Sequence, residues 1–272
     1  MAMLTPPQLL AFDLDGTLLA SDSSVRPRVR EAIIAAREAG YILAASTGRP
    51  WPQTKPVVEA AGGMDYAVCL NGAVVVDART GDQLAMRTMS AADAVEAAAV
   101  ARRLIDDVSL GADMADGRHI WEDHFHPSMP VDISVERVKD ALEHIDGDVL
   151  TWLVDSSEMG LDEVVACLHG QLPVGLEARP AGLDMAEIAS DGVNKASGLQ
   201  IVARKHGLTR EHVMAFGDAL NDIEMLDWAV HSVAMANGAP PVLDLARHLA
   251  PSNDDDGVAV VIEQLLAGTL FA

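Results

Sequence analysis

The chain has 272 residues, half of them hydrophobic and 4% aromatic, and its 41 acidic and 19 basic residues give a formal net charge of −22. This length allows one large domain or two smaller ones, each with its own core. So acidic a chain is a poor partner for nucleic acid or for an anionic membrane. No apolar run approaches the length of a membrane span, and the first residues lack the basic region and apolar core of a secretory signal. We therefore expect a cytoplasmic protein that binds neither nucleic acid nor membrane.

The first predicted element is a buried strand that ends in two carboxylates. Four apolar residues at 9–12 precede Asp13, Asp15 and Gly16, a pattern typical of a strand covered on both faces of a parallel sheet. Ligands of such sheets bind beyond the carboxyl ends of the strands. Because the two carboxylates repel each other and would repel an anionic substrate, they need a cation, and Mg²⁺ prefers oxygen ligands. Asp13 could then attack phosphorus while Asp15 protonates the leaving oxygen and later activates water. Taken alone, the motif could also be an acidic turn.

A helix over 26–39 and a second buried strand over 41–45 follow, and this strand also ends in polar groups. The hydroxyl of Thr47 and backbone N–H groups around Gly48 could hold a phosphoryl oxygen. Arg49 could add its forked guanidinium to the substrate. An ordinary strand-to-helix turn is the alternative.

A third strand over 66–70 reaches Asn71, and a short strand over 73–76 continues the chain. Asn71 is placed to contact a ligand, and asparagine also tolerates a left-handed turn. We expect both roles at this position.

The pattern changes at about residue 82, and residues 83–186 indicate a separate α+β unit inserted between core elements. Trp121, His124 and Trp152 are its candidates for substrate contact. A metal cluster at 119–126 is disfavoured, because alternate strand residues point to opposite faces. The expected elements are helices over 90–105, 134–144 and 161–169, and strands over 108–114, 118–125, 149–154 and 174–177.

The core pattern resumes near residue 184, where a helix over about 195–206 begins with Lys195 in its first turn. A cation at that position opposes the helix dipole, so it is a poor choice for stability alone. Its ammonium could instead neutralise Asp13 and an incoming phosphate. The alternative is a surface lysine that keeps its head group in water.

A further buried strand over 213–216 forms the second acidic strand end of the chain. Asp218 could complete the metal site with Asp13, while Asn221 and Asp222 share one face of a starting helix. Those two could bind the metal through water or orient Lys195. The segment could also serve only as a helix cap with an acidic first turn. A strand over 231–235, a turn at 237–238 and a closing helix over 258–266 complete the chain.

Four segments together resemble the motifs of the haloacid dehalogenase superfamily in order and spacing: Asp13 to Thr17 (DLDGT), Ser46 to Arg49 (STGR), Gly192 to Lys195 (GVNK) and Gly217 to Asp222 (GDALND). Segments NGA at 71–73, AMANG at 234–238 and SNDDDGVA at 252–259 resemble its Cof-type subgroup of sugar-phosphate phosphatases. The resemblance implies an α/β fold with a Rossmann-like three-layer core, a mostly parallel sheet and an inserted α+β cap. We accordingly expect a catalytic core over 1–82 and 187–272 and a substrate-specificity cap over 83–186.

The resemblance also assigns roles, position by position. Asp13 is the nucleophile and Asp15 the general acid/base, Thr47 holds the transferring phosphoryl group, and Lys195 neutralises charge. Mg²⁺ is bound by the ligand set Asp13, the backbone carbonyl of Asp15, and Asp218, with Asn221 and Asp222 in support.

These features favour a Mg²⁺-dependent phosphatase acting on a small phosphate monoester, such as a sugar phosphate or a phosphorylated cofactor, as a monomer or a homodimer. Dehalogenase relatives lack the acid/base carboxylate at the position of Asp15. A phosphomutase with the same aspartyl-phosphate, or a non-catalytic sensor of a phosphorylated ligand, remains the alternative. Release of free phosphate would distinguish the phosphatase from both the phosphomutase and the sensor.

Overall fold

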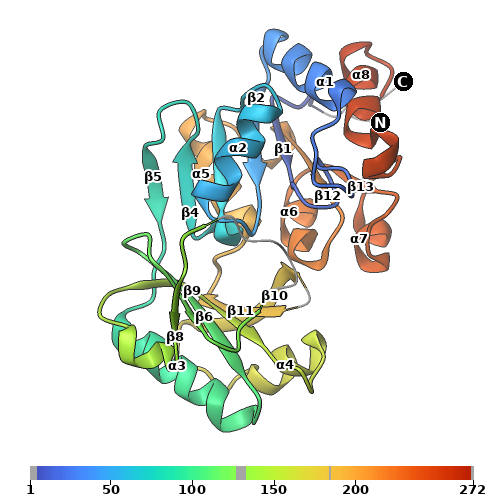
Figure 1. The fold of residues 1–272 in the computed structure, drawn as a ribbon. Helices are drawn as coiled ribbons and strands as arrows, with labels where there is room; N and C mark the ends of the chain where they lie inside the picture. The colour runs from blue at the N-terminus through green and yellow to red at the C-terminus, as the bar shows by residue number, and fades with distance from the viewer. Residues whose placement is uncertain (1–4, 127–132, 184, 271–272) are drawn as a thin grey trace. The chain divides into compact units, whose positions relative to one another are not determined.

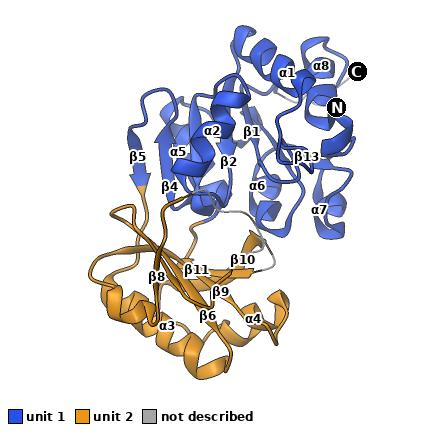
Figure 2. Ribbon diagram, in the orientation of Figure 1, with its two compact units in different colours: residues 1–85, 194–272 blue, residues 86–193 orange. Residues whose placement is uncertain are grey.

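The computed structural model describes residues 5–126, 133–183 and 185–270 (Figure 1). The chain divides into two compact units, which are considered separately (Figure 2). Unit 1 comprises residues 1–85 and 194–272, and unit 2 comprises residues 86–193. These boundaries, at 85/86 and 193/194, lie three and seven residues beyond the expected division at 82/83 and 186/187. The assignment of catalysis to one unit and specificity to the other stays a prediction.

Unit 1 is built on an eight-stranded sheet in which β1 lies between β12 and β2 and runs parallel to both. The strands from β14 to β3 are parallel, and β4 returns antiparallel to β3. This sheet is mostly parallel, as predicted. In spatial order its strands are β14 (His248–Ala250), β13 (His231–Met235), β12 (Val213–Gly217), β1 (Leu9–Phe12), β2 (Ile42–Ser46), β3 (Tyr66–Cys69), β4 (Val74–Asp77) and β5 (Gln83–Met86).

Helices cover both faces of this sheet and give three layers. Leu9 and Ala11 of β1 belong to a buried apolar cluster with residues of α5, α6 and α7. Successive residues of a strand point to opposite faces, so the equally buried Leu10 and Phe12 face the other side. Helices α1 and α8 pack against each other. The helices are α1 (Pro27–Glu38), α2 (Trp51–Ala60), α5 (Lys195–Lys205), α6 (Ile223–Trp228), α7 (Pro240–Leu245) and α8 (Gly257–Leu266).

Unit 2 contains a six-stranded sheet with helices α3 (Ala91–Leu104) and α4 (Leu161–Leu168). Its strand pairs are antiparallel except for β7 and β8, which are parallel. An apolar cluster joins the two helices to one face of the sheet. In spatial order the strands are β10 (Leu176–Leu183), β11 (Met185–Ser190), β9 (Val149–Asp155), β6 (Ser109–Met114), β7 (His119–Glu122) and β8 (Glu136–Val138). The predicted inserted α+β unit is present.

The prediction of a helix over 134–144 is wrong. That segment forms β8 and then a 3₁₀ turn, η2 (Ala141–His144). β8 gains backbone hydrogen bonds by pairing with β7, and the guanidinium of Arg137 donates to the carbonyl of Glu122 at 3.0 Å. Asp140 caps the turn, because its carboxylate accepts the N–H of Leu142 at 3.0 Å. Tertiary pairing therefore overrides a weak helical periodicity.

Three smaller differences concern element boundaries. The strand expected over 174–177 begins at Leu176 and extends to Leu183. The core was expected to resume near residue 184, but β11 pairs within the sheet of unit 2; residue 184 itself lies outside the described residues. Asn221 and Asp222 lie in a 3₁₀ turn, η4 (Leu220–Asp222), ahead of α6 rather than within a helix.

Candidate active site

Asp13 follows the central strand β1 directly, at the carboxyl end of the parallel sheet. The last residue of β1, Phe12, is opposite Phe216 of β12 and Ala45 of β2. The N–H of Asp13 donates to the carbonyl of Phe216 at 3.0 Å, and the side chain of Asp13 is buried. The register therefore brings the polar ends of three strands to one edge of the sheet, where α/β proteins bind ligands.

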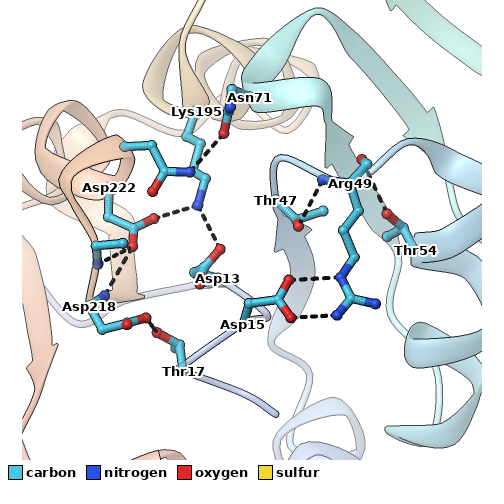
Figure 3. A network of polar contacts seen from close by, with 12 residues as sticks. Asp13, Asp15, Thr17, Thr47, Arg49, Thr54, Asn71, Lys195, Asp218 and Asp222 are labelled. Atoms are coloured by element: carbon cyan, nitrogen blue, oxygen red, sulfur yellow. Dashed lines mark hydrogen bonds and ion pairs between the residues drawn. The ribbon is translucent and has the colours of Figure 1, made fainter. Parts of the chain in front are cut away.

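Lys195 lies in the first turn of α5 and reaches Asp13 (Figure 3). Asn194 caps this helix by accepting the N–H of Ser197 at 2.9 Å. The ammonium of Lys195 donates to Oδ1 of Asp13 and to Oδ1 of Asp222, each at 2.6 Å. Burial alone would lower the pKa of Lys195, but the carboxylates of Asp13 and Asp222 outweigh it and raise the pKa above its usual value. The lysine is therefore charged and bridges two acids.

Asp218 and Asp222 form the other side of this cluster (Figure 3). Oδ2 of Asp222 accepts the N–H groups of Asp218 and Ala219, each at 3.0 Å, which fixes its carboxylate after β12. The hydroxyl of Thr17 donates to Oδ1 of Asp218 at 2.6 Å. Asp222 is thus held by its own loop, and Asp218 is held by the loop that follows β1.

The charges of this cluster fit a divalent cation. Within the described residues, the carboxylates of Asp13, Asp218 and Asp222 make the one group of three acidic, histidine or cysteine side chains whose ligand atoms lie within 4.8 Å of one another. Burial, followed by the charge of Asp222, raises the pKa of Asp13, and burial raises the pKa of Asp218 to about 6. One lysine charge does not offset three carboxylates. An all-oxygen set with excess negative charge is what hard divalent ions prefer.

Asp15 does not point into this cluster but pairs with Arg49 (Figure 3). Nε of Arg49 donates to Oδ2 of Asp15 at 2.7 Å, and Nη2 donates to Oδ1. We expected the guanidinium to contact the substrate. In the structure its Nε and Nη2 meet the acid/base candidate Asp15, and contact of Arg49 with a substrate stays a prediction.

The remaining predicted residues lie on the loops after β2 and β3. Oγ1 of Thr47 accepts the N–H of Arg49 at 3.2 Å, and Gly48 forms the bend between them. Asn71 is buried with a left-handed φ of 47°, and its Oδ1 accepts the amide of Asn221 at 3.0 Å. The N–H of Asn71 also donates to the carbonyl of Thr47 at 3.0 Å. Asn71 thus adopts the expected left-handed turn, while ligand contact by these residues stays a prediction.

Two residues of the motif segments, Gly16 and Asn237, were assigned no chemical role from the sequence. Gly16 has a φ of +80°, and a Cβ there would lie 2.3 Å from Oδ2 of Asp218. Asn237 donates to the carbonyl of Gly16 at 2.8 Å. The absence of a Cβ at Gly16 therefore allows Asp218 to approach the loop after β1. Glycine is favoured at this position for two reasons, the positive φ of the turn and this close approach. Only the positive φ was predictable from sequence.

The three candidates in unit 2 have different surroundings. Trp152 is fully buried in the apolar cluster beside α3 and donates its indole N–H to the carbonyl of Ala94 at 2.9 Å, so its expected role in substrate contact is wrong. His124 is exposed, whereas Trp121 is buried against Phe125 with ring centroids 5.1 Å apart. His119 pairs with Asp113 rather than with another histidine.

Residues 10–262 match the haloacid dehalogenase-like hydrolase family. The chain belongs to this family. It is 29% identical to the 5-amino-6-(5-phospho-D-ribitylamino)uracil phosphatase YitU of Bacillus subtilis, over 96% of this chain and 98% of the relative. It is 30% identical to the HMP-PP phosphatase of Serratia proteamaculans, over 89% and 88% of the two chains. The crystal structure of a haloacid dehalogenase-like hydrolase from Bacteroides thetaiotaomicron superposes with a TM-score of 0.78, at 25% identity, over 95% of this chain and 99% of the other.

These similarities confirm the predicted superfamily, its Cof-type subgroup and the predicted enzyme class, a phosphoric monoester hydrolase. They extend over both units, so the fold of the core with its inserted cap is that of the family. Among the described helices, none is long and apolar enough to cross a membrane.

Proposed function

We propose that the protein is a Mg²⁺-dependent phosphatase that cleaves a small phosphate monoester through an aspartyl-phosphate on Asp13. The observation that carries the proposal is the contact of Lys195 with Asp13 inside a cluster of three carboxylates, of which Asp13 and Asp222 are buried and Asp218 is partly buried. Such a cluster would repel an anionic substrate unless cations neutralise it, and a phosphate monoester is attracted once they do.

The reaction has two steps. A carboxylate oxygen of Asp13 forms a bond to phosphorus while the bond from phosphorus to the leaving oxygen breaks, and Asp15 gives that oxygen a proton. Water then attacks the phosphorus of the aspartyl-phosphate, Asp15 takes a proton from the water, and the bond to Asp13 breaks. The products are the alcohol and inorganic phosphate.

The remaining residues supply charge and position. Lys195 reduces the negative charge beside Asp13, which lowers the repulsion of an approaching phosphate, and Thr47 with the N–H groups near Gly48 holds phosphoryl oxygens. Asp13, Asp218 and the backbone carbonyl of Asp15 would hold Mg²⁺, supported by Asn221 and Asp222. When bound, the metal neutralises the carboxylates and the phosphate charge.

The substrate we propose is a phosphorylated sugar or a phosphorylated cofactor or cofactor precursor. The names of the relatives support this class, since one is a phosphatase of a phosphoribitylamino-uracil, one of HMP-PP and one, from Escherichia coli, of pyridoxal phosphate. We place the enzyme in the cytoplasm, as a monomer or a homodimer.

The test is phosphate release from a panel of sugar phosphates, nucleotides and phosphorylated vitamins, measured with Mg²⁺ and with EDTA. We expect release that requires Mg²⁺ and is strongest for one chemical class. Isomerised sugar phosphate without free phosphate would replace the proposal by a mutase. Binding without any turnover would replace it by a phospho-ligand sensor.

A further inference from the structure

The ion pair between Arg49 and Asp15 is bidentate. Two guanidinium nitrogens meet the two carboxylate oxygens, and the side chain of Arg49 is only 17% exposed. A planar fork on a planar carboxylate fixes both the position and the rotation of that group. The geometry therefore restricts Asp15 more than a single hydrogen bond would.

The backbone of Arg49 is itself anchored on two sides. Its N–H donates to Oγ1 of Thr47 at 3.2 Å, and its carbonyl accepts the N–H of Leu70 at 3.1 Å. Thr54, at the start of α2, donates its hydroxyl to the carbonyl of Pro50 at 3.0 Å and so fixes the next residue as well. The guanidinium thus extends from a rigid turn, and the orientation of Asp15 depends on that turn.

We propose that Arg49 is a positioning residue for Asp15: it holds the carboxyl group at the leaving oxygen instead of binding the transferred phosphoryl group. Each carboxylate oxygen has two lone pairs, and the fork uses one on each oxygen. A lone pair therefore remains for the proton that passes to the leaving group. This inference rests on the proposed function, in which Asp15 is the general acid.

A positioning role predicts an effect that depends on the leaving group. Nitrophenolate leaves without a proton, whereas a sugar or alkyl alkoxide needs one. kcat/KM reports only the steps through formation of the aspartyl-phosphate, so it isolates the proton donation. A residue that binds the phosphoryl group would instead affect every substrate equally.

The experiment measures kcat/KM of wild type, Arg49→Lys and Arg49→Gln for the best sugar or cofactor phosphate and for p-nitrophenyl phosphate. We expect Arg49→Gln to lower kcat/KM by roughly 10²-fold for the poor leaving group, the size of a general-acid contribution, and to leave nitrophenyl phosphate nearly unchanged. Arg49→Lys keeps the charge but loses the fork, so it should show the same pattern to a smaller degree.

Two further variants sharpen the result. Asp15→Asn should lower kcat/KM selectively for the poor leaving group as well. The double variant Asp15→Asn/Arg49→Gln should show little further loss, because both substitutions remove the same interaction. Arg79→Gln is the matched control. Arg79 also makes a bidentate ion pair with a carboxylate, that of Asp77, but this pair lies outside the candidate active site. The control variant should leave both substrates unaffected.

An equal fall for both substrates in the Arg49 variants would overturn the inference and return Arg49 to phosphoryl binding. Unchanged kcat/KM for both would overturn it too. A wild-type enzyme that releases no phosphate from any substrate would reject the proposed function, and this inference with it. If Arg49→Gln does not fold, Arg49→Lys alone decides between the selective and the uniform fall.

Discussion

The Nζ atom of Lys195 lies 2.6 Å from Oδ1 of Asp13, although 182 positions separate the two residues in the chain. Without this ammonium, Asp13 and Asp222 would be buried side by side with no positive charge between them. Breaking a buried ion pair by removing one partner typically costs about 3–5 kcal/mol.

We therefore expect Lys195→Met to lower kcat/KM by roughly 10²-fold or more and to destabilise the fold. The measurements are phosphate release and unfolding in urea. Lys205→Met, at the exposed end of the same helix, is the control and should change neither. Activity within a few-fold of wild type would show that Lys195 does not serve the reaction.

A comparison of Gly16 with Gly40 distinguishes the effect of a strained backbone from the effect of a collision at the candidate active site. Both have a positive φ, of +80° and +92°, but a Cβ at Gly40 meets nothing within 4 Å, whereas one at Gly16 would collide with Asp218. We expect both alanine variants to lose about 1–2 kcal/mol of stability from the left-handed backbone. Only Gly16→Ala should also lose activity. Equal activity in the two variants would contradict the close approach of Asp218.

Asp218 is expected to control the metal requirement. Because its carboxylate is a proposed ligand, Asp218→Asn should raise the Mg²⁺ concentration for half-maximal activity by at least about 10-fold. Asp227→Asn, an exposed acid of α6, is the control. Titration of EDTA-treated enzyme with Mg²⁺ measures the shift. Full activity in EDTA, or identical titrations for the two variants, would count against the metal site.

Two histidines on neighbouring strands predict how stability depends on pH. Burial lowers the pKa of His231 on β13 and of His248 on β14. The unfolded chain therefore binds more protons than the folded one between the folded pKa values and the usual pKa of about 6.5. The contribution of the two neutral histidines to the free energy of unfolding is therefore fully present above about pH 6.5, and it is lost as the pH falls through their folded pKa values.

The test compares urea unfolding at several pH values between 7.5 and 5 for wild type and His231→Asn. The variant should lose less stability on acidification, because one of the two groups no longer titrates. His169→Asn, at an exposed position, serves as the control and should follow wild type. An unchanged slope in His231→Asn would show that this histidine does not contribute.

The sequence predicted the places of the acidic strand ends because they follow from local patterns. An apolar run before Asp13 and another before Asp218 mark buried strands, and parallel strands bring their carboxyl ends to one edge. Lys195 was identifiable because a cation in the first turn of a helix is unfavourable without a partner. Its contact with Asp13 is consistent with that reasoning.

What the sequence could not give is the direction of side chains across the fold. Arg49 was expected to face the substrate, and nothing local shows that its fork meets Asp15, 34 positions away. The pairing of β8 with β7, and the burial of Trp152 against α3, likewise depend on contacts distant in sequence. Periodicity alone does not decide between such partners.

The central claim is that Asp13 is the nucleophile, and the most direct measurement is phosphate release by Asp13→Asn. The amide is close to isosteric with the carboxylate but cannot form the aspartyl-phosphate. We expect kcat to fall by at least about 10⁴-fold while the urea unfolding transition stays cooperative. Turnover within about 10-fold of wild type, in a preparation free of wild-type enzyme, would contradict the account.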